Sequence, residues 1–290
     1  MKAQTNNVVV VADTHCGSRL GLFPSVGAMI RNGEDTGNMV KPSPLQTWMF
    51  DRWIDFWTKF VPEATEGEPF DVVFNGDMID GRHHGQDMLI TNDLTEQVDI
   101  ALACFRPVFA RESVAKHLRR LFLVDGTECH CGLANETQKF LAARLPVTPD
   151  AHGNIVRREL WLEIGQKGRH NALAHFLHHI GSTSVSAYET TAIHRELVEA
   201  FQEAARWRNR VPDLVIRSHR HRQAKTSVPS ENGLAIAEVT AGWQGKTPHV
   251  YRIAGGRQAI PQFGGTAIRS GPLDTYTRSC VWGFKRTKTE

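Results

Sequence analysis

The sequence predicts an α/β fold with parallel strands, and three observations support this prediction. Short apolar runs rich in β-branched residues alternate along the chain with longer stretches in which apolar residues recur at helical spacing. The apolar runs are continuous rather than alternating, which is typical of strands buried on both faces. Most of the runs end in polar residues, as the first does at Asp13 and His15. Because open α/β sheets bind ligands at the carboxyl ends of their strands, these polar residues are candidate site residues.

The first half of the chain is predicted to alternate strands with helices. The strand predictions rest on apolar β-branched runs, and the helix predictions rest on apolar side chains spaced about 3.6 residues apart. In the first helix Trp48, Trp53 and Trp57 fall at mostly helical spacing, so we expect them in the core. The expected strands are 8–12, 70–74 and 121–124, and the expected helices are 45–61, 94–117 and 136–144.

The second half continues this pattern and then changes character. We expect strands at 159–164, 171–177, 214–217 and 234–241, and a helix at 189–207. Helical signals end near residue 233, and the tail that follows is rich in glycine, arginine, threonine and proline. The sequence has no evident internal repeat or linker. We therefore expect one domain over residues 1–290, in which 222–290 is a less regular, β-rich part.

Composition narrows the class of protein. The chain has 290 residues, of which 41% are hydrophobic and 22% are charged, and this excludes a disordered chain, a collagen-like repeat and a coiled coil. A net charge of +3 permits a phosphate-bearing partner without indicating a densely basic surface. Five cysteines, without a signal-peptide or membrane-span pattern, favour a cytoplasmic protein with reduced thiols and no membrane partner. Histidine is enriched, with 14 residues that lie mostly in short clusters.

Several of the expected strands end in residue types that bind metal ions. Asp13 and His15 are two residues apart, so at an extended strand end both side chains would point the same way. His219 and His221 repeat this spacing, and Asp77 follows a glycine that lets the backbone approach closely. Carboxylates combined with imidazoles suit manganese, iron, zinc or nickel. Two such ions side by side bind a phosphoryl oxygen and activate water, so we expect phosphoester hydrolysis.

Five motifs follow one another in a fixed order between residues 8 and 221. They are Asp13 with His15, then GDMID at 76–80, a glycine turn at Gly126, a single strand-end histidine, and SHRH at 218–221. This order resembles that of the calcineurin-like metallophosphoesterases, over about three-quarters of the chain. The resemblance implies an α/β fold of two packed mixed β-sheets flanked by helices, which is a four-layer sandwich. It also implies a hydrolase with a binuclear metal site, for which manganese is our first choice of metal.

The resemblance further implies which residues bind the two ions. Asp77 would bridge them. The strand end near residue 177 would supply one histidine, for which we choose His178 over His175 and His179 because it stands directly at the end of the apolar run. The implied ligands of the first ion are Asp13, His15 and His221 with the bridging Asp77, and those of the second ion are His178 and His219 with Asp77.

The segment GTECH at 126–130 departs from the family pattern. Thr127 stands in the place of the family's asparagine, and Glu128 stands in the place of the histidine that assists the leaving group. Threonine is a poor neutral ligand, so either the second ion binds more weakly, or Glu128 or His130 replaces the missing group. We favour His130, as a displaced proton donor or a phosphate contact. This form of the motif and the stretch GDMIDGRHHG resemble phage-encoded or prophage-encoded members of the family.

The expected substrate is a phosphodiester in DNA, RNA or a nucleotide. A long loop at 17–44 and a tail that mixes basic and aromatic residues would extend the site beyond one phosphate group. Arg82, His83 and His84 closely follow the bridging aspartate and are expected to bind the substrate phosphate. Two alternatives stay open. One is a phosphomonoesterase, either a protein phosphatase or a nucleotidase, and the other is a catalytically silent nucleic-acid-binding protein on the same scaffold.

Overall fold

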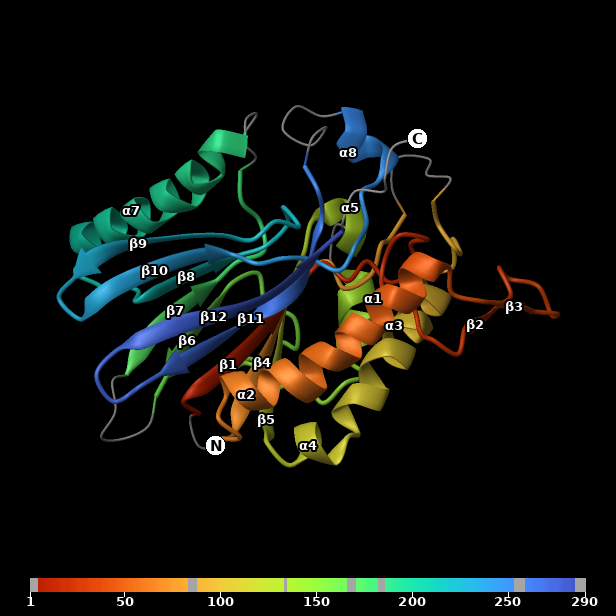
Figure 1. Ribbon diagram of the computed structural model, residues 1–290, viewed down its shortest axis with the longest axis horizontal. Coiled ribbons are helices and arrows are strands. Elements are labelled where there is room, and N and C mark those ends of the chain that lie inside the picture. Colours follow the sequence, from red (N-terminus) through yellow and green to blue (C-terminus); the bar gives the residue numbers. More distant parts are fainter. Residues whose placement is uncertain are drawn as a thin grey trace.

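The structure is a computed structural model that describes residues 5–82, 88–132, 135–165, 171–181, 186–252 and 259–284. Two five-stranded sheets pack face to face at its centre, and helices cover the outer face of each (Figure 1). Among the described helices, none is long and apolar enough to cross a membrane. All five cysteines are free thiols, as the sequence analysis expects.

The first sheet has the strand order β12-β11-β1-β4-β5. In its interior β1, β4 and β5 run parallel, with Val9 opposite Val72 and Phe74 opposite Leu123. β11 pairs antiparallel with both β1 and β12. The strands are β1 (Asn7–Val11), β4 (Phe70–Asn75), β5 (Leu118–Val124), β11 (Gln262–Ser270) and β12 (Thr275–Gly283).

The second sheet has the strand order β6-β7-β8-β10-β9. β7, β8 and β10 run parallel, and the two edge strands β6 and β9 are antiparallel to their neighbours. Its strands are β6 (Leu160–Ile164), β7 (Ala172–Phe176), β8 (Leu214–Arg217), β9 (Ala224–Ser230) and β10 (Gly233–Val239). Both sheets are therefore mixed, and the expected fold of two packed mixed sheets flanked by helices is confirmed.

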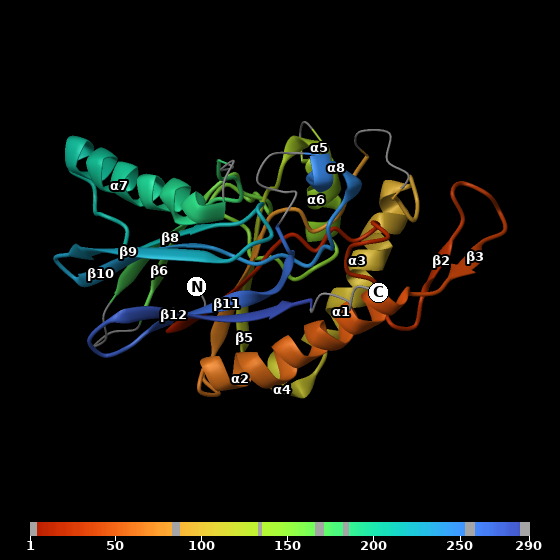
Figure 2. The same ribbon diagram turned by 45° about the horizontal axis from the view of Figure 1, so that its top comes forward.

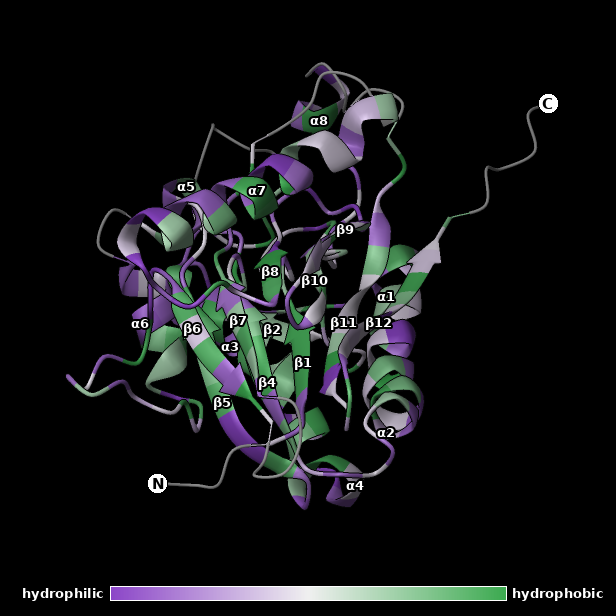
Figure 3. Ribbon diagram, turned by 90° about the vertical axis from the view of Figure 1, so that its left-hand side faces the viewer, coloured by the Kyte–Doolittle hydropathy of each residue, from purple (hydrophilic) through white to green (hydrophobic). Residues whose placement is uncertain are grey.

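Three apolar clusters join the layers. Val8 and Val10 of β1 meet Ile216 of β8 between the two sheets. Helix α7 (Glu189–Trp207) covers the outer face of the second sheet through Ile193 and Leu197. The outer face of the first sheet packs against aromatic-rich helices. Figure 2 shows the four layers in succession, and Figure 3 shows that the strands at the centre are the most hydrophobic part of the fold.

One long helical segment covers the first sheet where the sequence predicts a helix at 45–61. It consists of α1 (Pro44–Asp55), a π-helical turn η1 (Phe56–Phe60) and α2 (Val61–Ala64). Ser43 caps its start, because the Ser43 hydroxyl accepts a hydrogen bond from the Gln46 backbone N–H while the Gln46 side chain accepts one from the Ser43 backbone.

The region predicted as one helix at 94–117 contains two helices. They are α3 (Leu94–Phe109) and α4 (Glu112–Ala115). Pro107 lies in the last turn of α3, where a missing N–H and a bulky ring disfavour continued helix. β5 begins at Leu118, three residues before the predicted strand start.

The C-terminal part contains more regular structure than the sequence indicates. It contributes β9 and β10 to the second sheet and β11 and β12 to the first, with a short helix α8 (Pro248–Arg252) between them. The strand β11 is hard to predict because Gly264 and Gly265 lie in its interior, where glycine normally weakens a strand. Gly265 is needed there, since an added Cβ would lie 2.6 Å from the carbonyl oxygen of Val10.

The loop at 17–44 contains a small hairpin that projects from the body of the molecule (Figures 1 and 2). It is formed by β2 (Ala28–Ile30) and β3 (Asn38–Val40). The remaining described elements are α5 (Glu128–Cys131), α6 (Glu136–Ala142) and the 3-10 turn η2 (Ser186–Tyr188).

Candidate metal centre

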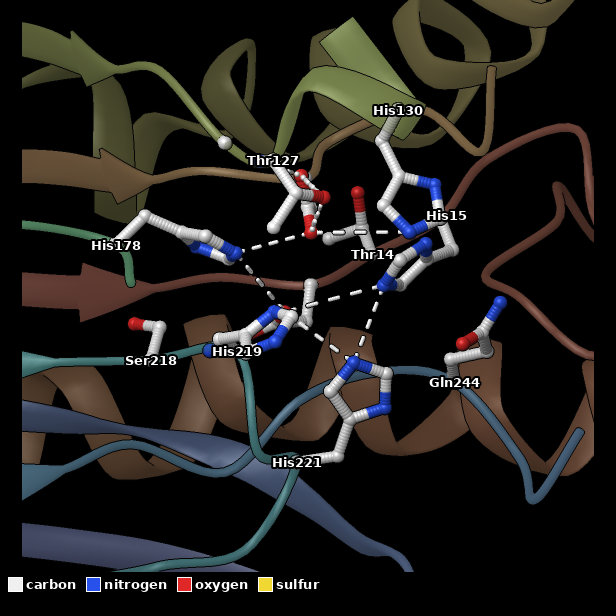
Figure 4. A network of polar contacts seen from close by, with 12 residues as sticks. Thr14, His15, Thr127, His130, His178, Ser218, His219, His221 and Gln244 are labelled. Atoms are coloured by element: carbon white, nitrogen blue, oxygen red, sulfur yellow. Dashed lines mark hydrogen bonds and ion pairs between the residues drawn. The ribbon is translucent and has the colours of Figure 1, made fainter. Parts of the chain in front are cut away.

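The six expected metal ligands lie together at the carboxyl ends of the central strands. They come from the segments that follow β1, β4, β7 and β8, two of these strands in each sheet. Figure 4 shows the histidine side chains pointing toward a common centre. Three groups of candidate ligand atoms occur among the described residues, each group within 4.8 Å. The groups are Asp13–His15–His221, His15–Asp77–His130 and Asp77–His178–His219.

The backbone at five of these six residues adopts the left-handed region. A positive φ is uncommon for residues other than glycine, costs about 1–3 kcal/mol and is concentrated at functional sites. The φ values are 55° at Asp13, 42° at His15, 52° at Asp77, 69° at His219 and 50° at His221. The prediction that Asp13 and His15 sit on an extended strand end was therefore wrong in detail. Tight turns after the strands, rather than the strands themselves, aim these side chains.

Asp13, His15 and His221 form the first group. Asp13 Oδ1 lies 3.2 Å from His221 Nε2 and 3.8 Å from His15 Nε2. The Nε2 atoms of the two histidines are 3.1 Å apart. Asp13 and His15 are buried, and His221 is partly exposed. One carboxylate with two imidazoles is a donor set typical of metal sites that keep positions open for substrate.

Asp77, His178 and His219 form the adjoining group. Asp77 Oδ2 lies 2.9 Å from His178 Nε2, and the His178 and His219 rings meet edge to face with their centroids 5.4 Å apart. His178 Nε2 is also 3.8 Å from Asp13 Oδ1, an atom of the first group. The two groups are thus in direct contact, as a site for two neighbouring ions requires.

Hydrogen bonds on the far side of the rings orient two of the imidazoles. His15 Nδ1 lies 3.0 Å from Asp80 Oδ1, and His178 Nδ1 lies 2.7 Å from the backbone carbonyl oxygen of Asn75. Because both partners are acceptors, each ring carries a proton on Nδ1 and turns Nε2 toward the cluster. Histidines that bind metal ions almost always have such a partner on the other nitrogen.

Two buried polar atoms of the cluster make no well-directed hydrogen bond among the residues that the structure describes. They are Asp13 Oδ1 and His178 Nε2, whose near neighbours are other cluster atoms, His221 Nε2 at 3.2 Å and Asp77 Oδ2 at 2.9 Å. A buried polar atom without a partner destabilises the fold by about 1–3 kcal/mol. Both atoms belong to expected ligands. A carboxylate oxygen and an imidazole nitrogen are ligand atoms that manganese, iron, zinc and nickel bind. The residues present therefore fit two divalent cations, which would satisfy these atoms.

Two glycines allow the close packing around Asp77. A Cβ on Gly76 would lie 2.3 Å from His178 Nδ1, and a Cβ on Gly126 would lie 1.9 Å from Asp77 Oδ1. Thr127, the next residue, donates two hydrogen bonds to Asp77, from its backbone N–H to Oδ1 at 2.8 Å and from its hydroxyl to Oδ2 at 3.1 Å. The threonine in the asparagine's place thus contacts the expected bridging carboxylate.

Of the two residues expected to assist the leaving group, only His130 lies in the cluster. Its ring packs edge to face on His15 with the centroids 4.5 Å apart, and its Nε2 is 3.9 Å from Asp77 Oδ2. Burial lowers the pKa of His130 to about 4, so its imidazole is neutral at pH 7. Glu128 begins the same helix, α5, but its side chain is exposed.

The expected phosphate-binding residues are not part of the cluster where they are described. Arg82 is exposed, and its Nε donates a hydrogen bond to the carbonyl of Asn92. His83 and His84 lie outside the described residues. In the basic tail, Arg269 is buried and paired with Glu66, so it adds nothing to an exposed basic surface.

Two residues that the sequence analysis did not single out support the cluster from behind. Asp80 is fully buried, and its Oδ1 contacts His15 Nδ1 and accepts a 3.0 Å hydrogen bond from Gln244 Nε2. Its backbone carbonyl oxygen lies 2.5 Å from His130 Nδ1. The second aspartate of GDMID is a signal that could have identified Asp80. Gln244 lies in a loop after β10 and has no comparable signal.

Two of the buried histidines are expected to carry an extra proton when no metal ion is bound. Burial alone would lower the pKa of His15, but the carboxylates of Asp13 and Asp80 outweigh burial and raise this pKa to about 10. Burial likewise opposes a charge on His178, but Asp77 and Asp13 raise the pKa of His178 to about 9. Both pKa values lie above neutral pH, so His15 and His178 are positively charged at pH 7 when no metal ion is bound.

Metal binding near neutral pH is therefore expected to release about two protons per chain, because a ligating imidazole must be neutral. Affinity for the ions should consequently rise with pH up to about pH 9 to 10, the range of these two pKa values. Calorimetric titrations in buffers of different ionisation enthalpy measure the proton count. Binding without proton release, or with an affinity independent of pH between 6.5 and 8.5, would contradict this expectation.

Comparison with known proteins adds two structural likenesses. No protein-family model matches the sequence, and no curated protein is significantly similar to it. A conserved uncharacterized protein of Streptococcus pneumoniae, described as a predicted phosphoesterase, aligns over 97% of this chain and 99% of its own at 10% identity, with a TM-score of 0.32. Vacuolar protein sorting 29 from Cryptosporidium parvum aligns over 97% of this chain and 100% of its own at 10% identity, with a TM-score of 0.37.

Proposed function

We propose that the chain is a metal-dependent phosphoesterase of the calcineurin-like type, with two divalent cations in the cluster of aspartates and histidines. The observation that carries this proposal is the convergence of Asp13, His15 and His221 with Asp77, His178 and His219 from four separate strand ends. These are the residues that the order of motifs selects from the sequence. Manganese remains our first choice of metal.

The chain's own residues provide the fixed charge and geometry of such a site. When bound, two cations supply positive charge for phosphoryl oxygens and make water nucleophilic near neutral pH. Asp77 belongs to the group with His178 and His219 and also lies close to His15 of the first group, and Thr127 fixes its carboxylate by two hydrogen bonds. Asp80 holds His15, and the carbonyl of Asn75 holds His178. These contacts keep the ligands in place before substrate arrives, which limits the reorganisation needed during reaction.

A phosphodiester in nucleic acid or a nucleotide is the proposed substrate. The loop after β10 touches the cluster, since the backbone N–H of Trp243 donates a hydrogen bond to the backbone carbonyl of Asp13 and the Gln244 side chain donates one to Asp80. Further along this loop Lys246 Nζ lies 4.0 Å from the centre of the Tyr251 ring, which is 58% exposed. Residues 240–252 include no acidic side chain. An exposed ring beside a cation suits a nucleobase next to a phosphate.

The experiment compares bis-p-nitrophenyl phosphate with p-nitrophenyl phosphate, using metal-stripped protein resupplied with Mn²⁺. We expect metal-dependent turnover with a preference for the diester, and a Tyr251→Ala variant should raise KM for a dinucleotide more than for the nitrophenyl diester. Preference for the monoester would favour a phosphatase or nucleotidase instead. Absence of turnover together with nucleic-acid binding that survives chelation would favour the silent binding protein.

A further inference from the structure

We propose that His130 is a ligand of the first ion rather than the proton donor to the leaving group. The first ion would then have five protein ligands and the second only three. The inference rests on the proposed function, because both ions belong to that site. The proposed ligands are Asp13, His15, Asp77, His130 and His221 for the first ion, and Asp77, His178 and His219 for the second.

The hydrogen bond made by the other ring nitrogen supports this role. His130 Nδ1 lies 2.5 Å from the backbone carbonyl oxygen of Asp80. A carbonyl oxygen can only accept, so Nδ1 carries the proton, and the neutral ring presents the lone pair of Nε2 on its other side. An Nε2 lone pair binds a cation but cannot donate a proton to a leaving oxygen. The same arrangement occurs at His15 and His178, which are expected ligands.

The neighbours of His130 identify the ion that it would bind. Its candidate ligand atom lies within 4.8 Å of those of His15 and Asp77. Asp77 is shared by both ions, whereas His15 is an expected ligand of the first ion alone. No candidate group among the described residues joins His130 to His178 or His219. His130 therefore belongs with the first ion.

The backbone of α5 is held firmly enough to position this side chain. On one side it packs against Gly81, where an added Cβ would lie 2.5 Å from the His130 carbonyl oxygen. On the other side the buried Cys131 accepts a 3.2 Å hydrogen bond from the Gly126 N–H. α5 has a single turn, and it begins directly after Thr127, so the residue that holds Asp77 also fixes the start of the helix that carries His130.

The consequence is a pair of unequal sites. In the family pattern the asparagine adds a ligand to the second ion, but here Thr127 donates its hydroxyl hydrogen bond to Asp77. The second ion is left with three protein ligands while the first gains His130. We expect the metal-free chain to take up two Mn²⁺ ions in two separate steps, a tight step at the first site and a weaker step at the second.

The test is a chelator-competition titration with Mn²⁺ on wild type, His130→Ala and Glu128→Gln. His130→Ala should lower the affinity of the tight step by about 10- to 100-fold or more and leave that of the weaker step unchanged. Losing a residue that only hydrogen-bonds a metal ligand already lowers metal affinity by about that factor, and a lost ligand should cost at least as much. Glu128→Gln is the matched control, because Glu128 lies on the same helix with an exposed side chain, and it should bind both ions as wild type does.

A second measurement needs no variant and therefore does not depend on how His130→Ala folds. X-ray absorption of wild-type protein loaded with one equivalent of Zn²⁺ should show three imidazole ligands, from His15, His130 and His221. Two imidazoles, or wild-type affinity for both ions in a folded His130→Ala variant with reduced turnover, would overturn the inference and return His130 to the role of proton donor. Failure of the wild-type chain to bind Mn²⁺ or Zn²⁺ would instead overturn the proposed function.

Discussion

Asp77→Asn is expected to lower kcat/KM for bis-p-nitrophenyl phosphate by at least about 10³-fold, because one change weakens the sites of both ions. Removing a single preorganised electrostatic contact typically costs about 10²- to 10³-fold in rate. Asp77 belongs to two of the three candidate groups, one with His15 and one with His178. His178 and the surrounding charges hold the pKa of Asp77 well below its usual range despite burial, so wild type contributes a full negative charge there. Steady-state assays at saturating Mn²⁺ provide the measurement.

Asp125→Asn is the matched control for this prediction. It makes the same chemical change in the loop after β5, where Asp125 accepts a hydrogen bond from Asn135 and belongs to none of the candidate ligand groups among the described residues. The kcat/KM of the Asp125→Asn variant should stay close to that of wild type. If Asp77→Asn kept more than a tenth of wild-type activity, the bridging role of Asp77 would be refuted.

Gly126→Ala is expected to reduce activity by at least about 100-fold although it replaces none of the candidate ligands. The added Cβ would lie 1.9 Å from Asp77 Oδ1 and 2.5 Å from its backbone nitrogen, so the carboxylate or the loop has to move. A displacement of about 1 Å in a reacting assembly can cost about 10²-fold in rate. The same displacement should weaken Mn²⁺ binding, which a chelator-competition assay measures alongside the rate.

Gly283→Ala tests whether this effect is local to the site. An added Cβ at Gly283, at the end of β12, would meet no described atom within 4 Å. This variant should match wild type in metal binding and activity. Equal losses in both variants would point to a general sensitivity of glycine positions, and normal activity in Gly126→Ala would contradict the placement of Asp77.

The strand-end positions of the candidate ligands were predictable from the topology of parallel strands, and the resemblance in motif order implied which of these residues would bind the ions. Carboxyl ends of neighbouring parallel strands meet at one edge, so polar residues after several apolar runs come together whatever the details of the turns. The choice among three nearby histidines followed from the same reasoning. His178 is buried in the cluster. His175 instead stacks on Trp161 with the ring centroids 4.1 Å apart, and His179 is exposed.

Features that depend on contacts between distant segments could not be predicted in the same way. The side chain of Gln244 meets Asp80 across 164 positions of the chain, and no local pattern encodes such a contact. Which ring nitrogen of His130 carries the lone pair depends on its contact with the backbone carbonyl of Asp80, 50 residues earlier in the chain. β11 contains two interior glycines because its neighbours β12 and β1 leave no room for a Cβ at Gly264 and Gly265. The left-handed turns at the ligands are likewise imposed by packing, since aspartate and histidine do not by themselves demand positive φ.

The central claim is that the cluster of aspartates and histidines hydrolyses phosphate esters with two divalent cations. Its most direct test is a titration of metal-stripped protein with Mn²⁺ during which bound metal and bis-p-nitrophenyl phosphate hydrolysis are followed together. Hydrolysis should be absent without metal and should rise to a plateau at two ions per chain, and Asp77→Asn should show no such rise. Full hydrolysis by the metal-free chain, or two bound ions with no hydrolysis of any phosphate ester, would contradict the account.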